Sequence, residues 1–308
     1  MAHPLCNQFS HGLPRDLRSL AMTTGETVLK EINFDGIIGP SHNYAGLSLG
    51  NIASASHRGQ TSHPREAALQ GLAKMRGNMA RGLPQGFLLP LPRPNGVLGD
   101  ALALDGTEDP ALRAAPWSAS AMWTANAATV SPAPDTRDGR CHLTPANLIT
   151  MLHRAQEWQD TKAQLDIAFG DAKHFAVHDA VPPTFGDEGA ANHMRLCESH
   201  GEAGVEVFVY GKPGGKFPAR QHEQASRAVA RMHGLDPKRT VFIEQNPEAI
   251  EAGAFHNDVV AVANERVLFT HARAFADPQG AYGAIREAFP TLELVEVPES
   301  AVSLEEAI

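Results

Sequence analysis

The sequence has little that would support a disulfide-stabilised, membrane or nucleic-acid-binding protein. Its three cysteines, Cys6, Cys141 and Cys197, form an odd and widely spaced set. That pattern is typical neither of a disulfide framework nor of a zinc module, and it favours a reducing cytoplasm. No apolar run approaches the ~18 residues of a membrane-spanning helix. With 26 basic and 35 acidic residues, a net charge of −9 and no basic block, we expect no nucleic-acid or anionic membrane partner.

Metal-binding patterns are missing as well. The sequence has no HExxH motif, no paired cysteines and no cluster of three His or Asp residues at ligand spacing. We therefore expect no metal, with a metal-dependent hydrolase kept as an alternative. The 308 residues are 43% apolar and 20% charged, an ordinary globular composition that is large enough to bury a core.

A strand, an amphipathic helix and a further strand recur along the chain. Residues 1–30 lack this periodicity and are predicted to be an extension, whereas 31–308 read as one domain built of α/β modules arranged as a ring. The helices are predicted at 64–80, 145–158, 219–233 and 278–288. The strands are predicted at 32–38, 87–91, 175–181, 205–210, 240–243, 258–263, 266–271 and 292–297.

Two segments carry the best acid–base candidates. His256 and Asp258 are two residues apart at the start of a predicted strand, so both side chains are expected on one face. A histidine moves protons near neutral pH beside such a fixed anion. Asp187 and Glu188 are flanked by glycines that permit close approach to a ligand. The alternatives are a surface His–Asp pair at a strand end and a solvated turn.

Other segments offer small or basic residues. Residues 41–51 are rich in glycine, and Gly46, Ser48 and Gly50 match the spacing of a serine-hydrolase elbow. A serine hydrolase using Ser48 and His256 is therefore an alternative function. His153, Arg154 and Arg220 are either surface charges or ligands for anions, and Asn126 lies in a predicted strand of small residues. Carboxylates at one end and cations at the other suit a substrate with a guanidinium group and a carboxylate.

Five motifs, in order, closely resemble the N-succinylarginine dihydrolase family. They are NFDG at 33–36, YAGLSxGN at 44–51, WxANAAT at 123–129, GDEGAANH at 186–193 and FHNDV at 255–259. The resemblance implies an α/β fold of the pentein type, a propeller of five ββαβ modules, of which this chain holds about four. It also implies hydrolysis of N2-succinylarginine to N2-succinylornithine, ammonia and carbon dioxide in arginine catabolism, without metal or cofactor. A cytoplasmic homodimer is implied too.

By matching position, the resemblance implies that Glu188 and His256 are the catalytic acid and base and that Asp258 binds the guanidinium group. It implies that the remaining substrate-binding residues are Ala45, Gly46, Leu47, Ser48, Leu49, Gly50, Asn51, Ile52, Ala53, Ser54, Asn126, His153, Arg154 and Arg220.

One group that the resemblance implies has no match. The family's nucleophilic cysteine lies in a glycine-rich segment near the C-terminus, and none of the three cysteines here stands in such a motif. We expect a truncated chain, with a prematurely ended gene model or a split gene that encodes the fifth module separately as the alternatives, and little hydrolysis by this polypeptide alone. A non-catalytic guanidine-binding fragment is the alternative.

Overall fold

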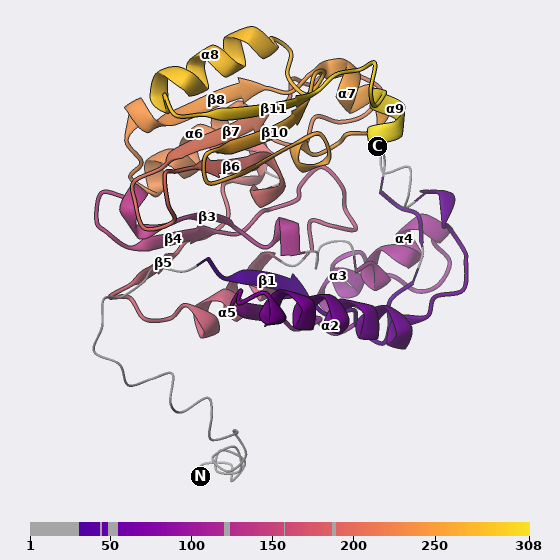
Figure 1. The fold of residues 1–308 in the computed structure, drawn as a ribbon. Coiled ribbons are helices and arrows are strands. Elements are labelled where there is room, and N and C mark those ends of the chain that lie inside the picture. The colour runs from indigo at the N-terminus through magenta and orange to yellow at the C-terminus, as the bar shows by residue number, and fades with distance from the viewer. Residues whose placement is uncertain (1–30, 44, 49–54, 120–123, 157, 187–188) are drawn as a thin grey trace.

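The structure is a computed structural model that describes residues 31–43, 45–48, 55–119, 124–156, 158–186 and 189–308. Its elements form four small sheets that lie one above another, from β1 with α2 at the bottom to β11 with α8 at the top (Figure 1). None of the described helices has the length and apolarity to cross a membrane. The architecture is α/β, as predicted.

Three of the sheets share one topology. In each, two antiparallel strands are followed by a helix and then by a strand parallel to the second. The first sheet has only a parallel pair on either side of a helix. The strands are β1 (Asn33–Gly36), β2 (Gln85–Leu88), β3 (Thr129–Ser131), β4 (Cys141–Thr144), β5 (Phe175–Val177), β6 (His193–Leu196), β7 (Val205–Tyr210), β8 (Thr240–Glu244), β9 (Ala261–Asn264), β10 (Val267–His271) and β11 (Glu293–Val297).

One long helix connects the parallel strands of each sheet: α2 (Pro64–Ala80), α5 (Trp158–Ala168), α6 (Glu223–Met232) and α8 (Pro278–Ala288). Three shorter described helices lie between them, α3 (Gly96–Ala101), α4 (Pro110–Ala114) and α7 (Pro247–Ala252), and α9 (Leu304–Ala307) follows β11. The described residues thus form three ββαβ modules and one βαβ unit, which we number one to four along the chain.

Each helix after the first packs between its own sheet and the sheet of the preceding module. On β7, Val205, Val207 and Val209 share a core with Tyr282 and Ile285 of α8. On the other face of β7, Phe208 packs on Ala225 and Val229 of α6. A strand covered on both faces needs apolar side chains in succession, which explains the sequence VEVFVY except for Glu206, whose buried carboxylate pairs with His193.

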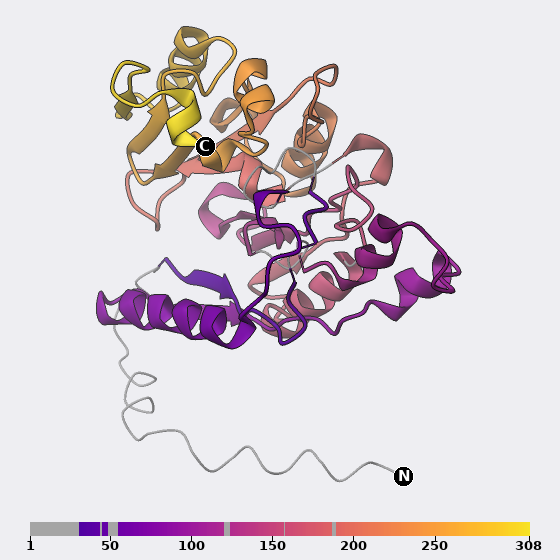
Figure 2. The ribbon, with the colours of Figure 1, turned by 90° about the vertical axis from the view of Figure 1, so that its right-hand side faces the viewer.

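Helix α2 departs from this arrangement. It lies on the side of β1 that faces away from the other sheets (Figures 1 and 2). Its bounds agree with the prediction, but of the face expected to be buried only Met75 is, whereas Leu69, Leu72 and Met79 are exposed. The apolar residues of α2 predict that another part of the protein covers this face of the helix, and the described residues do not provide such a cover.

The predicted helix over 145–158 is wrong. Residues 141–144 form β4, and a loop of turns follows up to residue 156, with Leu148 at a φ of 49°. Asn147 holds this loop, because its side chain donates to the carbonyl of Val181 at 3.0 Å and accepts from the amide of Ile149. Leu148 and Met151 are buried inside this loop, whereas Leu152, which a helix would also turn inward, is exposed.

The strand predicted over 258–263 is shorter than expected. Residues Asn257–Val259 form a 3₁₀ turn, and β9 begins only at Ala261. The hairpin turns at Glu265 and Arg266, because Asn264 pairs with Val267. Residues Thr124–Asn126 also form a 3₁₀ turn, so Asn126 does not lie in a strand. In both cases the predicted strand wrongly included the 3₁₀ turn that precedes the actual strand.

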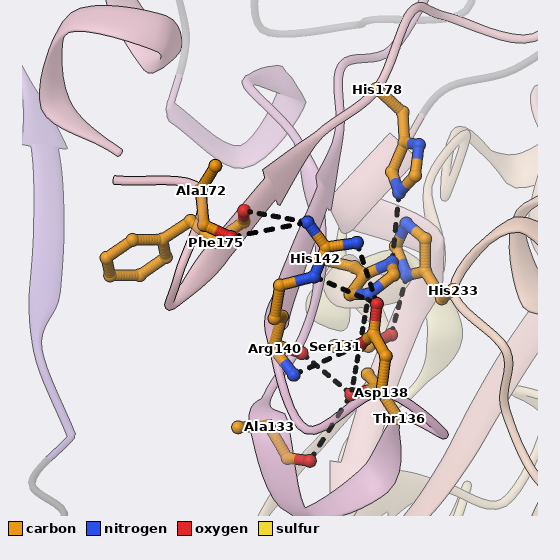
Figure 3. Close-up of polar contacts among 10 residues, drawn as sticks. All are labelled: Ser131, Ala133, Thr136, Asp138, Arg140, His142, Ala172, Phe175, His178 and His233. Atoms are coloured by element: carbon orange, nitrogen blue, oxygen red, sulfur yellow. Dashed lines mark hydrogen bonds and ion pairs between the residues drawn. The ribbon is translucent and has the colours of Figure 1, made fainter. Parts of the chain in front are cut away.

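Three histidines form the joint between modules two and three (Figure 3). His233, at the end of α6, lies 2.8 Å from the hydroxyls of both Ser131 and Thr144. His142 lies 2.9 Å from His178 through their ring nitrogens, and the rings of His178 and His233 stack at 5.4 Å. Burial, together with the neighbouring histidines, lowers the pKa of His233 to about 2.

This joint makes stability depend on pH. Below pH ~6.5 the unfolded chain binds a proton at His233 that the folded protein does not bind, so the free energy of unfolding falls as the pH falls. Between pH 7 and pH 5 we expect a loss of about 2 kcal/mol from this residue. Urea unfolding at pH 7, 6 and 5 measures it.

His233→Gln removes the titrating group, so its stability should fall less between pH 7 and pH 5. His174→Gln makes the same change at an exposed position and should behave as the wild type. Equal slopes for all three proteins would contradict the assignment.

Candidate functional site

Three 3₁₀ turns from different modules meet at one place. The turn η8 (Gly189–Asn192) contacts both η5 (Thr124–Asn126) and η10 (Asn257–Val259). Three of the five sequence motifs therefore converge, although more than 50 residues separate each from the next. Asp187 and Glu188 lie outside the described residues, but the chain enters η8 directly after them.

His256 and Asp258 differ in their surroundings. His256 is buried, and its ring lies 4.5 Å from that of Phe255. Asp258 is exposed and lines a cavity of about 330 Å³ between β6 and β9. Desolvation by the surrounding protein raises the pKa of Asp258, while the charge of His256 opposes the rise. The predicted alternation along a strand is wrong here, because both residues precede β9.

The basic residues are buried, so the alternative of solvated surface charges is wrong. Arg220 is 2% exposed, donates to the hydroxyl of Thr150 at 3.1 Å, and lies 5.3 Å over the ring of Phe255. Arg154 is 4% exposed. Burying a guanidinium group is costly unless an anion or a set of acceptors accompanies it. Both residues have interaction partners within the chain.

A hydrogen bond joins the glycine-rich loop to the loop of Arg154. The Ser48 hydroxyl lies 3.0 Å from Nε2 of His153, and both residues are buried. Ala45, Gly46 and Leu47 precede this contact, and Gly46 has a φ of 64° with its Cα facing the Arg58 side chain. The structure does not describe Leu49, Gly50, Asn51, Ile52, Ala53 and Ser54, nor the side chain of Asn126.

The loop of Arg154 also packs against η8. Gly189 has a φ of 63°, and a Cβ placed there would lie 2.8 Å from the Cβ of Ala146. Gly186 lies beside Ile149 less tightly, because a Cβ added there would make an ordinary contact of 3.8 Å with a methyl group of the isoleucine. The described site residues thus gather around the end of the segment that carries Glu188.

Neither described cysteine offers a thiolate. Burial raises the pKa of Cys141 to about 11 and also raises the pKa of Cys197. A protonated thiol is a weak nucleophile. Cys6 lies outside the described residues. Among the residues that are described, no group of His, Cys, Asp or Glu side chains is arranged to hold a metal ion.

The serine-hydrolase elbow is wrong. An elbow serine directly follows a strand, but β1 ends at Gly36, twelve residues before Ser48. The histidine within hydrogen-bond distance of Ser48 is His153. Sequence reasoning missed this pair, the contact of Thr150 with Arg220, and the ring of Phe255 beneath Arg220, because only the folded chain brings these residues together.

Solved structures define the class of the protein. The N-terminal domain of ArgZ, an arginine dihydrolase from the ornithine–ammonia cycle in cyanobacteria, matches 89% of this chain and 78% of its own with a TM-score of 0.56 at 15% identity. AgrE in complex with ornithine and NAD+ matches 87% of this chain and 30% of its own with a TM-score of 0.55 at 13% identity. The fold is therefore the pentein-type α/β fold of these enzymes.

Sequence comparison then gives the family. A family model described as "Succinylarginine dihydrolase" matches residues 28–308. The N-succinylarginine dihydrolase of Novosphingobium aromaticivorans is 70% identical over 285 residues, and that of Sphingopyxis alaskensis is 64% identical over 282. Each match covers 91% of this chain and 68% of the relative. The chain belongs to the succinylarginine dihydrolase family.

The contact between Gly189 and Ala146 is open to test. Gly189→Ala places a Cβ in a left-handed backbone and against Ala146, so the free energy of unfolding should fall by about 2 kcal/mol. Gly283→Ala is the matched control: it lies in α8 with open space around the added Cβ and should gain roughly 0.5–1 kcal/mol. Urea unfolding of both variants measures the difference, and equal stabilities would contradict the packing.

Proposed function

We propose that the chain binds N2-succinylarginine and, together with a nucleophile supplied by a further module, hydrolyses its guanidino group, giving N2-succinylornithine, two molecules of ammonia and carbon dioxide from two molecules of water. The observation that carries this proposal is the position of buried Arg220, in contact with Phe255, next to His256 and Asp258. Arg220 thus offers a cation for a carboxylate beside the motif that carries His256 and Asp258. The names of the relatives at 70% and 64% identity support it.

The proposed roles follow from charge and burial. Asp258, exposed to the cavity, binds the guanidinium group through its carboxylate oxygens. Arg154, Arg220 and His153 bind the carboxylates of the succinyl end and the amino acid. His256 and Glu188 move protons: they give one to the departing ammonia and take one from the attacking water.

The reaction also needs a nucleophile for the guanidinium carbon. A thiolate forms a C–S bond there, ammonia leaves with a proton from His256, and water then releases the thiol and leaves a ureido group. A second cycle of the same steps releases the second ammonia, and the resulting carbamate loses carbon dioxide to give the amine. Since burial keeps Cys141 and Cys197 protonated, we propose that a fifth ββαβ module supplies the thiolate. The relatives contain sequence beyond the matched 68% of their length.

Two exposed apolar surfaces support a place for that module. In module four, Val262, Phe269 and Val295 form one row across the sheet and are all exposed. At the other end of the molecule, the apolar face of α2 is exposed. A module whose helix covers this row and whose sheet covers α2 would repeat the packing seen around α8. A cytoplasmic homodimer stays a prediction.

Binding is the most direct test. Arg220→Gln removes a buried charge that we propose binds a carboxylate of the ligand. We expect this loss to weaken the affinity about 10- to 100-fold. Isothermal titration calorimetry with N2-succinylarginine should show that loss, whereas the exposed Arg286→Gln should leave the affinity unchanged. Equal affinity in both variants, or no binding by the wild type, would overturn the assignment.

Ammonia release tests the origin of the nucleophile. The purified 308-residue chain should release little or no ammonia from N2-succinylarginine, because loss of a catalytic group costs several powers of ten in rate. Adding the part of the Novosphingobium relative that lies outside the match should restore activity, and adding it with its cysteines changed to alanine should not. Rapid release by the chain alone would contradict this division.

A further inference from the structure

The side chain of Asn192 connects the turn that follows Glu188 to the turn that carries His256 and Asp258. Oδ1 of Asn192, the last residue of η8, accepts the backbone amide of Asn257 at 3.1 Å. Asn192 is 1% exposed and Asn257 is fully buried. The bond crosses from module three to module four, and a buried amide without an acceptor is unfavourable.

Asn257 is firmly held on its own side. Its Nδ2 donates to the carbonyl of Ala261 at 3.3 Å, and its carbonyl accepts the amide of Val260 at 2.9 Å. Nδ2 also contacts the sulfur of Met194 on β6 of module three at 3.6 Å. The turn is therefore rigid within module four. Any shift of Asn192 is transmitted to the peptide plane between His256 and Asn257.

We propose that Asn192 is a positioning residue, which fixes His256 and Asp258 relative to the turn that begins one residue after Glu188. This proposal rests on the proposed function only for the roles that it gives to His256 and Asp258. Asn192 follows Glu188 by four residues in the sequence. It is hydrogen-bonded to Asn257, the residue directly after His256. Acid–base chemistry depends on such spacing, because small displacements of catalytic groups lower rates steeply.

The choice of asparagine supports a role beyond packing. Nδ2 of Asn192 is buried and has no hydrogen-bond partner among the described residues. A buried polar group of this kind is uncommon in a native protein and points to a use other than stability. If the structure needed only a hydrogen-bond acceptor at this position, a side chain without the NH2 donor of asparagine would suffice.

The test compares Asn192→Leu, which keeps the size and loses the acceptor, with Asn192→Asp, which keeps the acceptor. The imidazole signals of His256, assigned by comparison with His256→Gln, are followed by NMR across pH, and affinity for N2-succinylarginine by calorimetry. We expect Asn192→Leu to shift the His256 signals and to weaken binding about tenfold. Asn192→Asp should retain slow hydrogen exchange at the Asn257 amide, which Asn192→Leu should lose.

Thr270→Val is the matched control for lost stability, since its buried hydroxyl donates to the carbonyl of His271 within module four. It should lower the melting temperature and leave the His256 signals unchanged. If Asn192→Leu behaves in the same way, the positioning role is overturned. Should Asn192→Leu fail to fold, Asn192→Ser, whose shorter side chain withdraws the acceptor, gives the same readouts.

The two proposals fail separately. If the wild type does not bind N2-succinylarginine, the proposed function fails. The His256 titration and the Asn257 hydrogen exchange still decide the role of Asn192, because neither needs a ligand.

Discussion

The arrangement depends on helices that are shared between neighbouring modules. Helix α8 serves its own sheet and the face of β7 that carries Val205, Val207 and Val209, while α6 covers the opposite face. Sharing a helix fixes the rotation of one module against the next, because apolar side chains interdigitate at fixed positions. Turns that precede the first strands of successive modules consequently point toward a common place.

The same geometry explains the buried polar residues between the modules. His233 satisfies hydroxyls of two strands in module two from the end of a helix in module three. Asn192 similarly binds a backbone amide of module four from module three. Polar contacts of this kind contribute less to stability than the apolar core does, but they require one relative position of the modules, since a displaced partner leaves buried groups unsatisfied.

Electrostatics divides the site into two parts. Arg154 and Arg220 are buried, where a guanidinium group needs anions or acceptors, while Asp258 faces a cavity that solvent or a ligand can enter. Desolvation raises the pKa of Asp258, and a bound cation would lower it again. These charges support the proposed ligand, which carries a guanidinium group and carboxylates.

Local sequence patterns determined the regular elements. The bounds of α2, β7 and α8 agree with the prediction, because proline at the start of a helix and β-branched residues in a strand act through neighbouring residues alone. The motif around Glu188 and His256 also identified the family from sequence, and the comparisons confirmed it. These features depend on short stretches of chain.

Only the tertiary structure decided the features that depend on partners distant in sequence. Residues 145–156 have helical periodicity, but Asn147 binds Val181 and holds them as a loop. The faces of His256 and Asp258, the burial of Arg220 and the contact of Ser48 with His153 follow from how the modules pack. A linear sequence carries propensity and pattern, whereas burial and hydrogen bonding are set by whichever residues the fold brings near.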